Sequence, residues 1–249
     1  MIPKIIHYCW LSNDPYPIQV QKCIDSWKQI LPDYKIMLWN FNRFNRESSI
    51  WVQEAFQKKK YAFAADFIRL YAVYNYGGFY LDSDVEVLKS FNDLLHLKTA
   101  ICWQDEKDGF EAACFGAEKE SHWLKVCLDY YQNKHFILPN GNIDIKPLPR
   151  IMEDCLKNAN YTINSVDSIE QIANSSLEKS IEVLPSFYFS PKSCKTGAIN
   201  KNKQTYSIHH FTASWVNPYD NLPLIAKIWK FLHLPDTKIR ERFFGKKGP

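Results

Sequence analysis

The segment YGGFYLDSDVE, residues 76–86, decides both the fold and the candidate site. Its two glycines separate an apolar helical pattern from Phe79–Leu81, three apolar residues typical of a buried strand. Asp82 and Asp84 follow at positions i and i+2, so an extended chain directs both carboxylates to the same side. At the carboxyl end of a strand in an open α/β sheet, such a pair lies where ligands usually bind. The pattern predicts a site for a hard divalent cation, which prefers oxygen ligands; the alternative is a pair of solvated turn aspartates.

Two further charges lie just before this segment. Asp66 and Arg69 are three residues apart on one face of a helix predicted for Ala62–Tyr76, which is apolar almost all round. Charged groups in such a helix are paired or bind a ligand. They form either an internal ion pair or, together with the two aspartates of the DxD triplet, one polar site. The second interpretation accounts for both pairs, because both elements lead towards the same sheet edge.

The order of the predicted elements indicates an α/β fold with a mixed, mainly parallel sheet. Apolar patterns predict a strand over Ile2–Trp10, a helix over Pro17–Leu31 and a strand over Tyr34–Asn40, which form a βαβ unit. Further strands are expected at Val85–Leu88, Thr99–Gln104, Ala112–Gly116, Ile181–Leu184 and Tyr206–His210. Further helices are expected at Phe44–Lys60, His122–Tyr131, Leu148–Ala159, Leu222–Leu234 and Asp236–Phe244.

Composition excludes several function classes. The net charge of +4 over 249 residues is too small to predict binding to nucleic acid. The seven cysteines contain no C-x-x-C pair, so neither a disulfide framework nor a zinc ribbon is expected. Asp66 and Arg69 interrupt the best apolar run, which is shorter than the roughly 18 residues that a spanning helix needs. Met1–Ile6 is too short for a signal peptide, and we expect a cytoplasmic protein that is soluble or peripheral on the membrane.

A second polar segment, YSIHHFTASW at residues 206–215, places two histidines beside a hydroxyl and an indole. A zinc site needs further His or Cys ligands at suitable spacing, and the segment has no H-x-x-x-H pair. The pair therefore has either a structural role or a role as part of a site that other segments complete.

These motifs together resemble those of a known enzyme family. Residues 2–10, IPKIIHYCW, and residues 62–70, AFAADFIRL, followed by the DxD segment, are similar to bacterial and fungal glycosyltransferases with a DxD sugar-binding region, family 32 of the sequence-based classification. His209-His210 with Ser214-Trp215 is similar to that family's C-terminal signature, and the large clostridial glucosylating toxins share the layout. The match follows the chain in order and is weakest over residues 135–180.

The resemblance implies a GT-A fold: one Rossmann-like domain over residues 1–221, with a helical tail over residues 222–249 packed on it. It also implies a retaining, metal-dependent enzyme that uses Mn²⁺ or Mg²⁺ and a nucleotide-diphosphate sugar, with UDP as the expected nucleotide. A hexose or N-acetylhexosamine would pass to a glycan or lipid-linked oligosaccharide, as in the synthesis of a surface polysaccharide such as a capsule.

Roles at the nucleotide follow from the same resemblance. Trp10 would stack on the nucleobase, and Asn40, after the second strand, would contact the nucleoside. Ser214 and Trp215 would contact the diphosphate, where hydroxyl and indole donors can stabilise negative charge.

Roles at the sugar and the metal are implied in the same way. Asp66 and Arg69 would hold the hydroxyl groups of the donor sugar. Asp82 and Asp84 would bind the metal and the ribose or diphosphate, with Asp84 the more direct ligand. His210 would complete the metal shell, and the histidine before it is the second candidate. The catalytic set is expected to be Asp66, Arg69, Asp82 and Asp84.

The C-terminal tail suggests a second hypothesis. Basic residues outnumber acidic ones over residues 238–247 and alternate with bulky apolar residues. Such a helix can rest on an anionic membrane, where a lipid-linked acceptor would be found. The alternative is a packed terminal helix with a solvated basic face.

Two other functions remain as alternatives. A phosphatase of the haloacid dehalogenase type also has a D-x-D after an apolar strand, but its motif requires Thr or Val where this chain has Glu86. A catalytically inactive carbohydrate-binding protein is the other alternative. Glycan binding that depends on neither metal nor nucleotide would indicate it.

Overall fold

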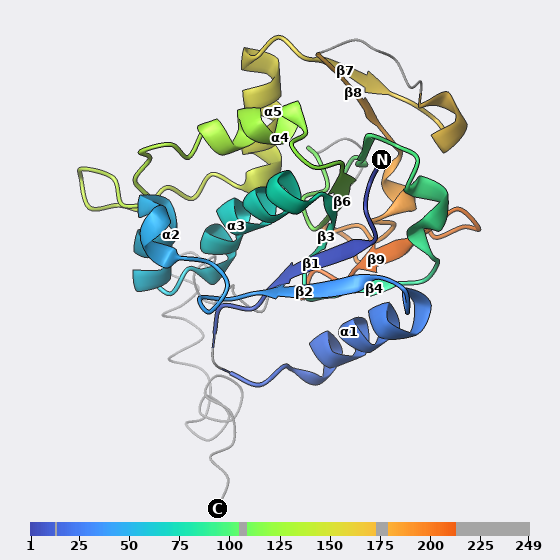
Figure 1. Ribbon diagram of the computed structural model, residues 1–249, viewed down its shortest axis with the longest axis horizontal. Coiled ribbons are helices and arrows are strands. Elements are labelled where there is room, and N and C mark those ends of the chain that lie inside the picture. The colour runs from blue at the N-terminus through green and yellow to red at the C-terminus, as the bar shows by residue number, and fades with distance from the viewer. Residues whose placement is uncertain (13, 105–108, 173–178, 213–249) are drawn as a thin grey trace, which may run out of the picture. The chain divides into compact units, whose positions relative to one another are not determined.

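A five-stranded sheet forms the centre of the molecule, in the strand order β2-β1-β3-β6-β5 (Figure 1). The computed structural model describes residues 1–12, 14–104, 109–172 and 179–212. β1 pairs in parallel with β2 and β3, whereas β6 is antiparallel to both β3 and β5, so four strands share one direction. The strands are β1 (Ile5–Cys9), β2 (Lys35–Trp39), β3 (Gly78–Leu81), β5 (Thr99–Ala100) and β6 (Cys114–Ala117). The predicted mixed, mainly parallel α/β fold is confirmed.

Helices cover both faces of this sheet (Figure 1). α1 (Ile18–Ile30) connects β1 to β2 and lies on one face, as a βαβ unit requires. The helices of the other face are α3, α4 and α5, and α2 packs against α3. They extend over Ile50–Gln57 (α2), Tyr61–Tyr76 (α3), His122–Asp129 (α4) and Leu148–Asn158 (α5). The fold therefore has three layers, with the sheet in the middle.

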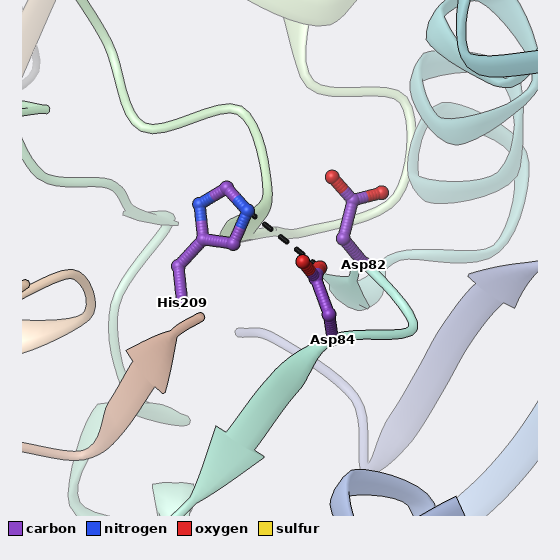
Figure 2. A group of neighbouring side chains, drawn as sticks. All are labelled: Asp82, Asp84 and His209. Carbon is purple, nitrogen blue, oxygen red and sulfur yellow. Dashed lines mark ion pairs between the residues drawn. The ribbon is translucent and has the colours of Figure 1, made fainter. Parts of the chain in front are cut away.

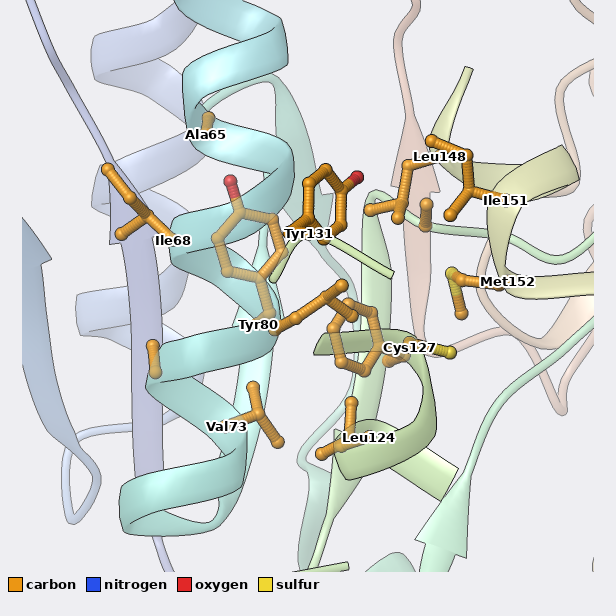
Figure 3. Close-up of a cluster of buried hydrophobic side chains, with 14 of the residues drawn as sticks. Ala65, Ile68, Val73, Tyr80, Leu124, Cys127, Tyr131, Leu148, Ile151 and Met152 are labelled. Carbon is orange, nitrogen blue, oxygen red and sulfur yellow. The ribbon is translucent and has the colours of Figure 1, made fainter. Parts of the chain in front are cut away.

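Alternation along the strands divides the core into two clusters. In β3, Phe79 and Leu81 pack towards α1, whereas Tyr80 points to the opposite face. There its ring lies among apolar side chains of α3, α4 and α5, including Val73, Leu124 and Ile151 (Figure 3). All four residues of β3 are buried, so the strand that leads into the DxD triplet is enclosed by the core on both faces.

Two small sheets and several single turns complete the described chain. β4 (Val85–Val87) pairs antiparallel with β9 (Ser207–His209), and β7 (Thr162–Ser165) pairs in parallel with β8 (Ser180–Val183). The short 3₁₀ turns are Arg46–Ser48, Phe91–Leu94, Ile169–Gln171 and Ser186–Tyr188. Within the described ranges, no helix has both the length and the apolar character needed to cross a membrane.

Three details differ from the sequence-based expectations. The strand expected at Thr99–Gln104 is limited to β5, and Cys102 and Trp103 form only isolated bridges. The helix predicted for Phe44–Lys60 is a 3₁₀ turn followed by α2, because Ser49 is extended and its hydroxyl caps α2 by accepting from Val52 N. β7 was not predicted, since its residues are polar and partly exposed and have no apolar alternation. The tail over residues 222–249, with its two expected helices, lies outside the described residues, and the domain over residues 1–221 remains a prediction.

The Gly77-Gly78 pair turns the chain from α3 into β3. Both glycines have positive φ, +64° and +104°, a region that other residues rarely adopt. A Cβ on Gly78 would lie 2.5 Å from the carbonyl oxygen of Ile5 on the neighbouring strand. The buried side chain of His7 on β1 also holds this turn. Its Nδ1 accepts a hydrogen bond from Trp39 Nε1, so the proton of the ring is on Nε2, which donates to Gly77 O at 2.7 Å. Burial lowers the pKa of His7 to about 4, which keeps the ring neutral.

Gly78→Ala should therefore lower the free energy of unfolding by about 3 kcal/mol, because backbone strain and a close contact add together. Gly141→Ala is the matched control, since Gly141 also has positive φ but has no atom within 4 Å of the added Cβ. The control should cost only the strain, about 1 kcal/mol. Urea unfolding of the three proteins measures both values, and equal losses would contradict the close-packing argument.

Candidate functional site

Three predicted site residues follow three adjacent parallel strands. Trp10 comes directly after β1, Asn40 after β2 and Asp82 after β3. Because the carboxyl ends of parallel strands meet at one edge of a sheet, these residues are brought to the same edge. The parallel pairing of β1 with β2 and β3 thus brings the predicted nucleotide and metal residues to one edge of the sheet.

Arg69 lies at the centre of the polar groups at this edge. It is only 5% exposed, and its guanidinium contacts Asp66 Oδ1 at 3.1 Å and Asp82 Oδ2 at 3.2 Å. It also donates to the backbone oxygen of Ala112 at 2.8 Å. Both earlier interpretations of the Asp66–Arg69 pair therefore hold: it is an internal ion pair, and it is joined to the DxD triplet.

Tyr80 contacts both Arg69 and Asp82. The guanidinium of Arg69 lies 4.7 Å from the centre of the Tyr80 ring, and the Tyr80 hydroxyl donates to Asp82 Oδ1 at 2.8 Å. Each oxygen of the Asp82 carboxylate thus has a partner that fixes its orientation. Sequence reasoning treated Tyr80 only as a strand residue, although it alternates onto the same face as Asp82.

One guanidinium serves two carboxylates, and this affects their protonation. Burial raises the pKa of Asp66 to about 7, because the neighbouring Asp82 offsets part of the opposing effect of Arg69. Burial likewise raises the pKa of Asp82 above its usual value. The site thus contains more carboxylate than its own positive charge balances, which favours binding of a cation.

His209 completes a cluster with the two aspartates of the DxD triplet. In the β4–β9 ladder His209 is opposite Val85, the residue after Asp84, so the imidazole lies beside the turn. His209 Nε2 is 3.6 Å from Asp84 Oδ1 (Figure 2). Asp82, Asp84 and His209 each offer a ligand atom, and these three atoms lie within 4.8 Å of one another. Two carboxylate oxygens and one imidazole nitrogen form a donor set that fits a divalent metal such as Mn²⁺.

His210, which was expected to bind the metal, points elsewhere. Its Nε2 lies 2.8 Å from Glu86 Oε2, outside the cluster of the two aspartates. Successive residues of an extended chain project to opposite sides, so only one of two adjacent histidines can face the DxD triplet. The structure therefore moves the candidate ligand from His210 to His209, the second candidate.

Thr212 holds the segment that follows β9 against the DxD turn. Its backbone N–H and its hydroxyl both donate to Asp84 Oδ2, at 2.8 and 2.9 Å, while Asp84 O accepts from the N–H of His210 at 3.1 Å. These bonds leave Oδ1 of Asp84 facing His209. The C-terminal segment is thereby joined to the DxD triplet, as the resemblance implied.

Glu111 is a site residue that sequence reasoning missed. Its side chain is 1% exposed, and Oε1 lies 3.4 Å from His209 Nδ1 while accepting from Ala113 N at 2.8 Å. Despite burial, which favours the neutral form, the nearby His209 holds the pKa of Glu111 below its usual value. The signal was present: a single carboxylate in the apolar run of residues 109–117.

Of the four residues predicted to contact the nucleotide, the structure describes two, Trp10 and Asn40. Trp10 Nε1 donates to Asp14 O at 2.9 Å and its ring packs edge-on against Tyr16, while Asn40 Oδ1 accepts from Asn42 N. Both residues therefore lie at the carboxyl edge of the sheet and make local contacts, and their contact with a nucleotide stays a prediction. Ser214 and Trp215 lie outside the described residues.

Residues 17–100 match the model of a protein family described as the glycosyltransferase sugar-binding region containing a DXD motif. The matched segment includes Asn40, Asp66, Arg69 and the DxD triplet, and it excludes Glu111 and His209. The family pattern thus covers the site residues between Asn40 and Asp84, and it does not cover those that come from the later part of the chain.

Relatives found by sequence include fungal proteins whose names refer to the mannosylation of inositol-containing ceramides. The chain is 36% identical over 102 residues to inositol phosphoceramide mannosyltransferase 3 of Schizosaccharomyces pombe, a match that covers 38% of this chain and 28% of that protein. It is 34% identical over 102 residues to mannosyl phosphorylinositol ceramide synthase SUR1 of Saccharomyces cerevisiae, covering 38% and 26%. The matches thus span less than a third of these relatives' length.

The solved structures that match this chain are distant from it in sequence. The glycosyltransferase GlyE of Streptococcus pneumoniae TIGR4 superposes with a TM-score of 0.49 at 14% identity, covering 99% of this chain and 64% of that one. The PaToxG glycosyltransferase superposes with a TM-score of 0.48 at 20% identity, covering 64% and 69%.

Arg69→Met should lower the free energy of unfolding by about 3–5 kcal/mol, because it leaves buried carboxylates without their partner. Arg150→Met is the control, since Arg150 pairs with Glu153 on the surface and is 53% exposed. A surface pair contributes about 0–1 kcal/mol. Urea unfolding in the presence of EDTA compares them, and a loss for Arg69→Met no larger than for Arg150→Met would show that the buried pairs contribute little.

Asp66 should also make stability depend on pH. Its pKa is 3.8 in the reference state and about 7 in the fold, so between these values the folded protein keeps a proton that the unfolded chain releases. The free energy of unfolding should therefore fall as pH rises from about 4 to 7, and Asp66→Asn should reduce that slope. Asp33→Asn is the exposed control and should leave the slope between pH 4 and 7 unchanged. Lys4 lowers the pKa of Asp33, so the contribution of Asp33 to the free energy of unfolding changes only below about pH 4. Urea titrations at several pH values in EDTA measure the slopes; an unchanged slope in Asp66→Asn would refute the assignment.

Proposed function

We propose that this protein is a metal-dependent glycosyltransferase that takes its sugar from a nucleotide-diphosphate donor. The observation that carries the proposal is the grouping of Asp82, Asp84 and His209 at the carboxyl end of β3, next to the buried Arg69–Asp66 pair. The match of residues 17–100 to a glycosyltransferase sugar-binding region supports the same activity.

Asp82, Asp84 and His209 would hold the metal, either Mn²⁺ or Mg²⁺. A bound divalent cation supplies positive charge for the diphosphate leaving group. Arg69 and Asp66 would orient the sugar, since a guanidinium donates and a carboxylate accepts hydrogen bonds from hydroxyl groups. Their burial and mutual contacts hold both groups in one geometry before the donor binds, which lowers the entropic cost of orientation. Retention of the anomeric configuration belongs to this proposal.

Asp84 and Asp82 would have different tasks. Asp82 has both oxygens engaged by Arg69 and Tyr80, whereas Asp84 has one oxygen fixed by Thr212 and the other facing His209. Asp84 is therefore the more direct metal ligand. Asp82 links the metal position to Arg69, and so links the metal to the sugar.

The names of the relatives support a hexose donor and a lipid-linked acceptor. One fungal relative is named an inositol phosphoceramide mannosyltransferase and the other a mannosyl phosphorylinositol ceramide synthase. We extend this to a hexose or N-acetylhexosamine donor, with UDP as one candidate nucleotide, and to a glycan or lipid-linked acceptor of a surface polysaccharide. Trp10, Asn40, Ser214 and Trp215 are the proposed nucleotide contacts. A cytoplasmic protein with its tail on an anionic membrane is the corresponding location.

The phosphatase alternative requires one aspartate of the triplet as a free nucleophile. Asp82 is held by Arg69 and the Tyr80 hydroxyl, and Asp84 is held by Thr212, so both carboxylates are oriented as ligands. Glycan binding that depends on neither metal nor nucleotide leaves the grouping of Asp82, Asp84 and His209 without a role. These observations favour the transferase.

Removing a metal ligand tests the assignment. Asp84→Ala and His209→Gln should each lower Mn²⁺-dependent hydrolysis of the donor by about 10²-fold or more, since either change opens the metal shell. His210→Gln is the matched control: it changes the neighbouring histidine, whose ring faces Glu86, and should keep activity within about threefold.

The assay should use UDP-glucose, UDP-N-acetylglucosamine and GDP-mannose, with and without Mn²⁺, and chromatography to measure the nucleotide diphosphate released. Near-full activity in Asp84→Ala would refute the metal site. Full activity in His209→Gln together with its loss in His210→Gln would return the metal ligand to His210.

A further inference from the structure

Glu111 lies behind the candidate metal site and does not line it. It belongs to the short segment before β6. Its buried carboxylate contacts Nδ1 of His209, whereas Nε2 is the ring nitrogen that faces Asp84. A buried carboxylate is destabilising by several kcal/mol unless it is paired and hydrogen-bonded. Oε1 of Glu111 accepts from the Ala113 N–H and faces Nδ1 of His209 at 3.4 Å, and these two contacts offset part of that cost. Oε2 of Glu111 and Nδ1 of His209 are buried without a hydrogen-bond partner among the described residues, so the two side chains depend on each other for charge compensation.

Three consecutive residues of this segment contact three separate parts of the site. Glu111 contacts His209, Ala112 O accepts from Arg69, and Ala113 O accepts from the N–H of Asp82 at 2.8 Å. The position of Glu111 is thus set by the same backbone that holds the sugar and metal residues. It is part of the support of the site, although it lies outside the segment that the family pattern describes.

The two ring nitrogens of His209 face different groups. Nε2 faces Asp84 Oδ1 at 3.6 Å, and Nδ1 faces Glu111 Oε1 at 3.4 Å. A neutral imidazole carries its proton on one nitrogen and offers a lone pair on the other. A carboxylate faces each nitrogen, so the two ring positions become different only when a cation binds beside Asp82 and Asp84. The cation would take the lone pair of Nε2, and the carboxylate of Glu111 would favour the remaining proton on Nδ1.

We propose that Glu111 is the positioning residue of His209: it fixes the ring orientation and the Nδ1–H form, so that Nε2 is the nitrogen presented to a divalent cation. The inference rests on the proposed function, because it assumes that the Asp82–Asp84–His209 cluster binds a metal. It adds a residue that touches neither metal nor sugar and acts through His209 alone. Carboxylates in this position behind a ligating histidine change metal affinity by about 10–100-fold.

The chain contains a close chemical match for a control. Glu54 also contacts a histidine, with Oε1 2.7 Å from His135 Nδ1, and its Oε2 accepts from the backbone N–H groups of Phe136 and Ile137. This pair joins α2 to the loop after α4, and neither residue belongs to the metal cluster. Glu54→Gln thus removes the charge of a Glu–His pair without altering the support of the site.

The experiment measures the dissociation constant of Mn²⁺ in the full chain by electron paramagnetic resonance of free Mn²⁺, with unfolding temperatures recorded in EDTA. Glu111→Gln should weaken binding by about 10-fold, and Glu111→Met, which also removes the acceptor, by up to about 100-fold. Glu54→Gln should leave the constant within about twofold. In a His209→Gln background, Glu111→Gln should add no more than about a twofold change, since its effect passes through the imidazole.

The possible results separate this inference from the proposed function. Wild-type affinity in both Glu111 variants, while Asp84→Ala abolishes binding, would overturn the role of Glu111 and keep the metal site. An undiminished effect of Glu111→Gln in the His209→Gln background would also overturn it, because Glu111 would then act by another route. Absence of Mn²⁺ binding by the wild type would overturn both.

A measurement on the unchanged protein covers the case in which the Glu111 variants do not fold. With ¹⁵N-labelled histidine and Zn²⁺ as a diamagnetic ion, two-bond proton–nitrogen spectra report which ring nitrogen of His209 is protonated; His209→Gln supplies the assignment. A proton on Nδ1 with metal on Nε2 is expected. A proton on Nε2 would overturn the inference.

Discussion

The buried guanidinium of Arg69 is the interaction on which the rest of the site depends. A charge removed from water must be matched at short range, and here three segments supply the partners: Asp66 from α3, Asp82 after β3 and the carbonyl of Ala112 before β6. None of these segments can shift without leaving the charge exposed to an apolar interior. The same constraint that stabilises the fold at this edge therefore holds the proposed sugar and metal residues in one geometry.

The proposed metal cluster combines two segments that lie more than a hundred residues apart in the chain. Asp82 and Asp84 follow a strand at the centre of the main sheet, and His209 arrives on β9, which pairs with β4 directly after the DxD turn. Thr212 and Glu111 hold that junction from opposite sides, Thr212 through Asp84 and Glu111 through His209. Asp82 and Asp84 are thus held by hydrogen bonds and His209 by an ion-pair contact with Glu111, and such outer contacts orient the ligands of a metal site.

Most of the fold that positions this site was predictable because it depends on local patterns. The apolar runs and helical spacing indicated β1, α1, β2 and α3, and positive φ at the Gly77-Gly78 turn matches the glycines in the sequence. The carboxylates of the DxD triplet and the Asp66–Arg69 pair were recognisable because their spacing is short and repeats the period of their element. Helix α2 was predicted too long, since a side-chain cap at Ser49 outweighs a continuous helical pattern.

By itself, the sequence determined that an α/β sheet would carry a pair of carboxylates at its carboxyl edge, with a buried Asp–Arg pair close by. Only the tertiary structure decided that His209, and not His210, joins them, and that Glu111 contacts the other ring nitrogen of His209. The reason is physical. Periodicity fixes which side of its own element a residue faces, whereas the register of β9 against β4 and the burial of Glu111 arise from pairing between segments far apart in the chain.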